Sequence, residues 1–366
     1  MKGYFDYAAT CPIDKDALNA YVHAAQHYFA NTQSLHDRGT QADDLLEHCR
    51  EKVARLIGGN KEGIYFTSGG TESNELAIDA LMKAGEGRNI ITTEAEHSSV
   101  RNLLKLYEQE GCNIINVPLL KNGTVDTEVV RRVIDKDTIF VLIQHVNADI
   151  GSIQPIREIS EICRQQGVLL HSDCVQSFGK VDVSEISPFV DSLSISSHKV
   201  YGPKGVGAVY ICPSLSFLSR IPNGTHENGR RPGTVNIPGI AGFTVAAEKM
   251  IREIDNHQQI IFRLKKAFLK EGEWEVVGEV DQQPVPILGI LLPHMEGQWA
   301  MLEGNRQGYH FSTGSACREG KAEPSGTLSA MGYEWDEAKS FIRISFSHHQ
   351  TEAEVKELAA FLKKGI

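Results

Sequence analysis

Short apolar runs alternate with amphipathic segments between about residues 60 and 240, and this alternation leaves few possible folds. The runs typical of β-strands are GIYFTS, NIITTE, NIINVPL, TIFVLIQHV, VLLHSD, DSLSIS and GVGAVYI. Between them lie TESNELAIDALMKAG, SSVRNLLKLYEQEG and PIREISEICRQQG, whose apolar residues recur with helical spacing. Alternating strands and helices predict an α/β fold with a largely parallel sheet and helices on both faces. Functional side chains in such sheets gather at the carboxyl ends of the strands.

The pattern changes after residue 240. The segment IAGFTVAAEKMIREIDNHQQIIFRLKKAFLKEG is long enough for an interdomain helix. It is followed by the short strands WEVVGE, PILGILLP and FIRISFS and by helices near GQWAMLEGNRQG and EAEVKELAAFLKK. We therefore predict a large domain over residues 13–250 and a smaller α+β domain that combines residues 1–12 with 251–366. The smaller domain would carry a mobile loop over about residues 312–325.

Composition excludes several classes of protein. A net charge of −10 argues against a nucleic-acid-binding surface, which needs a basic excess. The chain has no apolar run near the roughly 18 residues that a membrane helix requires. At its start, MKGYFDYAATCPIDKD reaches Asp6 before a hydrophobic signal region could form, so we expect a cytoplasmic protein.

The seven cysteines are odd in number and form no CxxC pair, a spacing that fits neither a zinc site nor a disulfide framework. We therefore predict no metal site. Most of these thiols, such as Cys163 and Cys212 in regular helix and strand patterns, fit the role of small buried hydrophobic residues. Cys317 does not, because FSTGSACREG surrounds it with small and hydroxylated residues. A thiol in so flexible a stretch is explained if it has to move.

A lysine directly follows the strand DSLSIS, at its carboxyl end. In SSHKVYGPKGVG, Lys199 is flanked by Ser196, Ser197 and His198. It is either a solvated loop cation or a partly desolvated amine that forms a Schiff base with an aldehyde cofactor. Lys204, five residues on among glycines, has the pattern of an ordinary surface residue.

Other strand ends carry groups that such a cofactor needs. In YFTSGGTESNELAI, a turn through Gly70 leads to Thr71 at the start of a helix, where free N–H groups can bind a phosphate. Asp173 ends VLLHSD and could keep a pyridine nitrogen protonated, although a turn aspartate is the alternative. Gln176 could donate to a ring oxygen. His97 in TTEAEHSSV could stack on the ring or move protons, unless it is a solvated loop residue.

Taken together, these segments resemble the cysteine desulfurases of the NifS/IscS type. TSGGTESN resembles the phosphate loop of that family, EAEHSSVR its histidine segment, HSDCVQSFGK its aspartate and glutamine segment, and SSHKVYGPKGVG its lysine segment. The resemblance implies pyridoxal 5′-phosphate as cofactor and the fold type I of class-V aminotransferases. It implies that the cofactor is bound by Gly70, Thr71, Asp173, Gln176, Ser196, Ser197, His198 and Lys199.

The same resemblance implies a reaction and an assembly. RRPGTVN matches a motif whose threonine, here Thr234, reaches the phosphate of the partner subunit's cofactor, which implies a homodimer. IRIS matches the segment whose arginine, here Arg343, binds the substrate carboxylate. L-cysteine would become L-alanine, with Lys199, His97 and Cys317 as catalytic residues, and Cys317 would carry the sulfur as a persulfide to an acceptor protein for iron–sulfur cluster assembly. The alternatives are a selenocysteine lyase or other pyridoxal-phosphate transferase, and a degenerate sulfur-carrier scaffold.

The chain departs from the family pattern at a few positions. Ala148 stands where the family usually has a second asparagine, and Ser347 follows IRISF where a glycine is usual. The pair His348 and His349 could suggest a metal but fits an exposed turn better. The SDCVQ segment and the missing asparagine resemble a NifS-like subgroup associated with the iron–sulfur enzyme of NAD biosynthesis.

Overall fold

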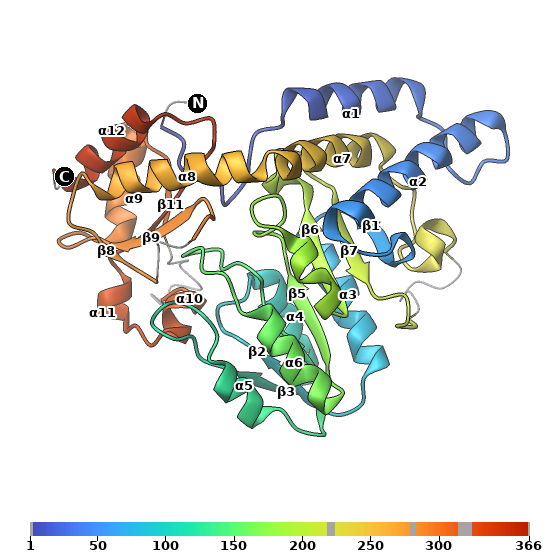
Figure 1. The fold of residues 1–366 in the computed structure, drawn as a ribbon, viewed down its shortest axis with the longest axis horizontal. Coiled ribbons are helices and arrows are strands. Elements are labelled where there is room, and N and C mark those ends of the chain that lie inside the picture. The colour runs from blue at the N-terminus through green and yellow to red at the C-terminus, as the bar shows by residue number, and fades with distance from the viewer. Residues whose placement is uncertain (1–2, 218–223, 279–282, 314–323, 365–366) are drawn as a thin grey trace.

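The larger of two sheets contains seven strands. We describe a computed structural model, which covers residues 3–217, 224–278, 283–313 and 324–364 (Figure 1). The strand order is β1-β7-β6-β5-β4-β2-β3, with β7 antiparallel to both neighbours and the other pairs parallel. The strands are β1 (Ile64–Thr67), β2 (Asn89–Thr92), β3 (Asn113–Asn116), β4 (Thr138–Leu142), β5 (Leu169–Asp173), β6 (Ser192–Ser196) and β7 (Gly207–Ile211). All seven predicted strands are confirmed.

Helices cover both faces of this sheet, as the alternation predicts. Adjacent residues of one strand point to opposite faces: Ile90 packs with α3 and α4, whereas Ile91 belongs to the core beneath α2, α6 and α7. The helices are α1 (Lys15–His27), α2 (Asp37–Ile57), α3 (Gly70–Ala84), α4 (Ser98–Gln109), α5 (Thr127–Val133), α6 (Ile156–Gln166) and α7 (Ile237–Arg252). The sequence interpretation had α3, α4 and α6 but not α1, α2 or α5.

The antiparallel strand β7 follows from its short connection to β6. Only residues 197–206 separate the two strands, too few for the crossover that a parallel pair requires. Gly207 pairs with Ser196 and lies against the turn that follows β1, where a Cβ on Gly207 would come within 2.8 Å of the Gly69 backbone. This close approach joins the turn after β1 to the segment that carries Lys199.

A second, antiparallel sheet has the order β10-β11-β9-β8. Its core includes the fully buried rings of Phe5, Phe268 and Phe346. Its strands are β8 (Glu275–Val276), β9 (Ile287–Leu291), β10 (Ser312–Thr313) and β11 (Phe341–Ser345). The accompanying helices are α8 (Ile254–Leu269), α9 (Gly297–Arg306), α10 (Gly326–Ala330), α11 (Trp335–Ala338) and α12 (Glu352–Lys363). No helix of the described ranges is long and apolar enough to span a membrane.

The long helix predicted after residue 240 is two helices. The chain leaves helical geometry at Glu253, which ends α7 and precedes α8. The two helices run along one edge of the molecule, from the seven-stranded sheet to the four-stranded one (Figure 1). The boundary near residue 250 stays a prediction, although the sheets on either side of it are separate.

The N-terminal segment packs against the smaller sheet, whose strands lie near the other end of the sequence. The Phe5 N–H donates to the His310 carbonyl at 2.7 Å, and the Ser345 N–H donates to the Phe5 carbonyl at 2.8 Å. Two N–H···O bonds and a buried ring therefore hold residue 5 beside β11. The following residues run from there to the larger sheet.

A buried ion pair holds the segment that leads to Thr234. The Arg50 guanidinium on α2 donates to both oxygens of Glu227, at 2.8 and 2.7 Å, and Glu227 also accepts from the Phe66 N–H at 2.7 Å. The Glu227 side chain is fully buried. Residue 227 lies in a turn and has a positive φ of 49°. These contacts therefore stabilise a backbone conformation that is uncommon for residues other than glycine.

We expect Glu227→Gln to destabilise the protein by about 3 kcal/mol, because it leaves the buried Arg50 charge without its main partner. Urea denaturation measures this change. Glu128→Gln is the matched control: Glu128 faces Arg131 at 3.5 Å on the exposed surface, and its loss should cost less than about 1 kcal/mol. Equal effects of the two substitutions would contradict the role given to Glu227.

Candidate active site

Four strands of the larger sheet end near the candidate catalytic residues. Lys199 follows β6, Asp173 ends β5, His97 follows β2, and Thr71 lies in the helix that follows β1. Asp173 and Lys199 lie near enough to His97 for both charges to act on the pKa of its imidazole. The structure thus brings together the lysine, the aspartate and the histidine that the sequence predicts at one edge of the sheet.

The Asp173 carboxylate is held by two donors. The Asn74 side chain donates to Oδ2 at 2.8 Å, and the Val175 N–H donates to Oδ1 at 2.9 Å. Asn74 is itself buried on α3, and its amide oxygen lies 3.3 Å from Nε2 of the buried His171. A carboxylate oriented in this way can keep a ring nitrogen protonated.

Lys199 has an unusual environment for an amine. Its Nζ donates to the carbonyls of Ala8 at 2.5 Å and Ala9 at 2.8 Å. Burial lowers the pKa of Lys199 to about 8, and the positive charge of Arg343 adds to the lowering, while Asp173 opposes it. With this pKa about a tenth of the amine is uncharged at pH 7, far more than for an ordinary lysine, and this uncharged form can act as a nucleophile or a base.

His97 lies at the start of α4 and is held by that position. Its Nδ1 accepts from the Ser99 N–H at 3.1 Å and lies 2.8 Å from the Ser99 hydroxyl. Partial burial lowers the pKa of His97 and the Asp173 charge opposes this, so the ring is mainly neutral. Because Nδ1 accepts a backbone hydrogen, the proton of the neutral ring belongs on Nε2.

The start of α3 fits a phosphate group. Gly69 precedes the helix with φ of 151°, a backbone conformation that side chains rarely adopt, and no side chain of the described residues caps the helix. The hydroxyls of Ser196 and Ser197 are buried without a partner in the described part of the chain. A Cβ on Gly70 would lie 3.7 Å from that of Ser196, so this unpaired hydroxyl is beside the helix N-terminus. Unpaired hydroxyls and free N–H groups together are what a phosphate binds.

A cavity at this helix start is lined by Gly70, Thr71, His198 and Lys204 among others. His198 contacts the Thr10 hydroxyl through Nδ1 at 3.1 Å, and burial together with the Lys199 charge lowers its pKa to about 4. Lys204 is exposed, as its sequence context predicts, yet it also lines this cavity. Glu72, in the first turn of α3, pairs with Arg231 at 2.9 Å.

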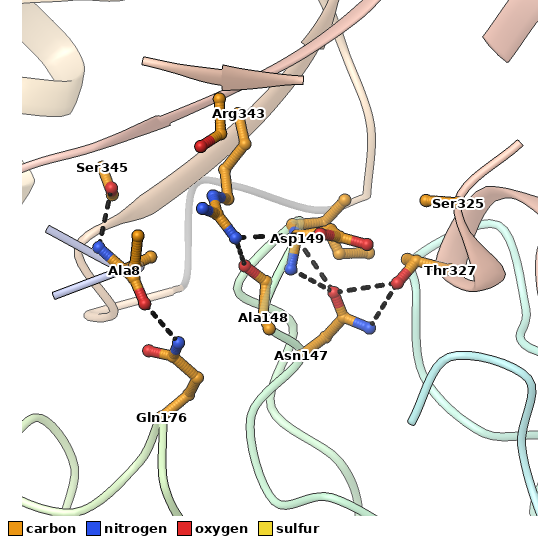
Figure 2. Close-up of polar contacts among 12 residues, drawn as sticks. Ala8, Asn147, Ala148, Asp149, Gln176, Ser325, Thr327, Arg343 and Ser345 are labelled. Carbon is orange, nitrogen blue, oxygen red and sulfur yellow. Dashed lines mark hydrogen bonds and ion pairs between the residues drawn. The ribbon is translucent and has the colours of Figure 1, made fainter. Parts of the chain in front are cut away.

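Gln176 has protein partners on both sides of its amide. Its Nε2 donates to the Ala8 carbonyl at 2.8 Å, and its Oε1 accepts from the buried Lys180 at 2.7 Å. Figure 2 shows the amide pointing toward Ala8, which in turn is held by the Ser345 hydroxyl. The lysine therefore determines which end of the Gln176 amide donates. The role of Gln176 toward a ring oxygen stays a prediction.

Arg343 projects from β11 toward the loop after β4. Its Nη1 donates to the Ala148 carbonyl at 3.1 Å, and its Nη2 donates to Asp6 at 2.9 Å (Figure 2 shows the first contact). Arg343 and His97 line the same cleft, together with Ala148, Asp149 and Thr327. The arginine predicted to bind a substrate carboxylate thus faces the cleft that contains the candidate catalytic histidine.

Among the predicted site residues that the structure describes, His97 and Arg343 line this cleft, Gly70, Thr71 and His198 line the cavity at the start of α3, and Lys199 lines another cavity. Thr234 is not among the residues that line these cavities. Thr234 is exposed, as a residue that serves a partner subunit would be. Cys317 and most of the loop around it lie outside the described residues. Of the other cysteines, all free, Cys11, Cys49, Cys163 and Cys174 are buried as expected, whereas Cys112 and Cys212 are half-buried.

The sequence interpretation missed three polar residues of the site. Asn74 lies in the quoted segment TSGGTESN, and its place four residues after the Gly70 turn puts it on the helix face toward Asp173. Lys180 lies four residues after Gln176, the spacing of helical neighbours. Asp6 could not be found from its surroundings, because its contact to Arg343 joins residues 337 positions apart.

The comparisons with known proteins agree on one family, and each match covers nearly the whole chain. The family described as Aminotransferase class-V matches residues 3–358. The chain is 43% identical to "Putative cysteine desulfurase NifS" of Bacillus subtilis, over 97% of this chain and 92% of that protein. It is 36% identical to "Cysteine desulfurase IscS" of Dictyoglomus turgidum, over 96% and 91% of the two chains. The solved structure titled "NIFS-LIKE PROTEIN" has a TM-score of 0.92 and 30% identity, covering 100% of this chain and 99% of the other.

We expect Asn74→Ala to weaken the binding of pyridoxal phosphate about tenfold, because a hydrogen bond to a charged carboxylate is lost. Titration of the cofactor-free protein, followed by absorbance, measures the affinity. Asn89→Ala is the matched control, since Asn89 donates to Asp135 at 3.1 Å on the exposed surface. Unchanged affinity in Asn74→Ala, with the cofactor-free protein still folded, would contradict a role of Asn74 at the cofactor.

Proposed function

Because this chain belongs to the aminotransferase class-V family, and within it to the cysteine desulfurases, we propose that it removes sulfur from L-cysteine and releases L-alanine. The observation that carries the proposal is the buried amine of Lys199 at the end of β6, with its pKa lowered to about 8 beside Asp173. A lysine of this kind is what a pyridoxal-phosphate enzyme needs for attachment of its cofactor and for proton transfer.

The family depends on pyridoxal phosphate, and the residues present fit this group. Gly70, Thr71, Ser196 and Ser197 would supply N–H and hydroxyl donors for the phosphate, and Asp173 would keep the ring nitrogen protonated. When bound, the cofactor withdraws electrons from the α-carbon of an amino acid. In this assignment Lys199 would be the residue that holds the cofactor covalently.

The substrate is oriented from the opposite side of the cleft. Arg343 binds the carboxylate of L-cysteine, since a guanidinium and a carboxylate form a paired, charge-assisted contact. The freed amine of Lys199 then removes the α-proton, and its lowered pKa leaves part of it uncharged and able to accept that proton. His97, neutral and protonated on Nε2, is available to donate to the substrate sulfur.

Cys317 completes the reaction as the acceptor of sulfur. Its thiolate attacks the substrate sulfur, so one sulfur–sulfur bond forms and the carbon–sulfur bond of the substrate breaks. The Cys317 sulfur is oxidised to a persulfide, the substrate carbon is reduced, and a proton completes L-alanine. The small residues that precede Cys317 in the sequence would allow this thiol to reach both the substrate and an acceptor protein.

The persulfide would be passed to a protein that assembles or contains an iron–sulfur cluster. The SDCVQ segment and Ala148 support the subgroup associated with NAD biosynthesis. The free cysteines among the described residues are consistent with a reducing compartment, and we place the protein in the cytoplasm.

We further propose a homodimer. Apolar side chains are exposed along α1 and the segment that follows it: Leu18 is 44% exposed, Val22 45%, Phe29 71% and Leu35 103%. Such a continuous series is typical of a surface that another subunit covers. The exposed Thr234 supports the same arrangement, because in this family pattern it serves the cofactor of the partner.

We expect light scattering after gel filtration to give a dimer for the natural chain and a monomer for Phe29→Asp, since a charge would be placed in an apolar interface. Trp299→Asp is the control: Trp299 is 52% exposed on α9, away from α1, and its replacement should leave the dimer intact. A monomeric natural chain would contradict the homodimer.

We expect Cys317→Ala to keep the absorbance of the bound cofactor but to lose sulfide and L-alanine production by at least about a hundredfold, because no thiol accepts the sulfur. Mass spectrometry after exposure to L-cysteine should find one extra sulfur on the Cys317 peptide of the natural chain. Cys112→Ala, at a half-buried cysteine, should retain activity, and Lys199→Ala should lose the cofactor absorbance. Turnover by Cys317→Ala would defeat the persulfide mechanism, and a natural chain that cannot bind the cofactor would favour the non-catalytic scaffold.

A further inference from the structure

The carboxylate of Asp6 forms an ion pair with the guanidinium of Arg343, the group assigned to bind the substrate carboxylate. Its Oδ1 lies 2.9 Å from Nη2 of Arg343, and the two side chains are only 21% and 13% exposed. The same oxygen accepts from the Ser312 hydroxyl at 2.8 Å. A pair this short and this shielded is stronger than an ordinary surface ion pair.

The backbone around Asp6 keeps the carboxylate in this place. Residue 6 forms a bridge with Ser345 on β11, two residues after Arg343 on that strand. On either side, Phe5 is fully buried and the Ala8 N–H donates to the Ser345 hydroxyl at 2.9 Å. Asp6 is therefore a built-in partner of Arg343 and not a side chain that reaches it by chance rotation.

Because of the geometry of a guanidinium, the contact of Asp6 with Nη2 affects how Arg343 can bind a second carboxylate. A carboxylate pairs with arginine through two nitrogens at once, either Nε with Nη2 or Nη1 with Nη2. Both pairs include Nη2, the nitrogen that Asp6 contacts. Nη1 already donates to the Ala148 carbonyl, while Nε is buried without a partner among the residues that the structure describes (Figure 2). An incoming carboxylate thus meets a guanidinium whose Nη2 is already paired with Asp6.

We propose that Asp6 sets the affinity of this enzyme for carboxylate-bearing ligands, by competing with the substrate carboxylate for Arg343. The inference rests on the proposed function, in which Arg343 binds L-cysteine. L-alanine carries the same carboxylate as the substrate, so an internal competitor also weakens product binding. In this inference Asp6 acts through Arg343, by competition for its guanidinium, and does not itself contact the substrate.

The test compares Asp6→Asn with the natural holoenzyme. Asparagine has the same shape and can still accept from Arg343 or Ser312, but it lacks the charge. We expect the KM for L-cysteine to fall about tenfold, the effect of removing one partly screened like charge, with a smaller change in kcat. The inhibition constant of L-alanine should fall by a similar factor.

Two ligands separate the carboxylate from the rest of the substrate. The probe 3-mercaptopropionate has a thiol and a carboxylate but no amine, and isothermal calorimetry should show about tenfold tighter binding to Asp6→Asn. Cysteamine has the thiol and amine without a carboxylate, and its inhibition constant should not change. Asp149→Asn is the matched control variant, since Asp149 lies 3.9 Å from Nη1 of Arg343, and its effect on either carboxylate ligand should be clearly smaller.

Several outcomes would overturn the inference. A KM that stays constant or rises in Asp6→Asn would mean that Asp6 merely holds Arg343 in place. Equal shifts for cysteamine and 3-mercaptopropionate, or equal effects of the two variants, would show a general change of charge. If the natural enzyme does not desulfurate L-cysteine, the proposed function fails, and binding of 3-mercaptopropionate by calorimetry still decides the role of Asp6.

Discussion

The contact on which the site depends is that of the Lys199 amine with the carbonyls of Ala8 and Ala9. It joins the larger sheet, which carries the lysine, to a segment that is anchored three residues earlier in the core of the smaller sheet. Gln176 reaches the same Ala8 carbonyl from the larger sheet, and Ser345 binds the Ala8 N–H from the smaller one. A single residue, Ala8, thus connects the strand ends of the larger sheet with β11.

This connection also brings charged side chains of both sheets near Lys199, where they act on the pKa of its amine. Arg343 comes from the smaller sheet, and its charge lowers the pKa of Lys199, while the carboxylates of Asp173 and Asp6 oppose that effect. Burial is the larger cause and would act on the lysine anywhere in the core. The charges that the two sheets bring together therefore adjust the pKa of Lys199 around a value that burial sets.

The sequence predicts the parts of the site that depend on local pattern. Strand ends are visible as the last residue of an apolar run, so Asp173 and Lys199 could be placed at one edge of a sheet before its topology was known. Contacts between distant segments have no such signal. Asp6 meets Arg343 across nearly the whole chain, and Asn74 reaches Asp173 only because α3 packs over β5 and β6. The helix α1 was missed because its apolar residues are divided between a buried and an exposed face.

At position 148, where the chain departs from the family pattern, a backbone carbonyl makes a contact to the site although the side chain is small. Ala148 lacks the amide of the usual asparagine, yet its carbonyl accepts from Arg343. The turn that presents this carbonyl is held by Asn147, whose Oδ1 accepts the N–H groups of Asp149 and Ile150 and whose Nδ2 donates to Thr327 (Figure 2). A side chain at 148 is thus not needed to orient the arginine. Its absence leaves more room in the cleft beside Arg343, so the guanidinium and its competing carboxylate carry more of the selection among substrates.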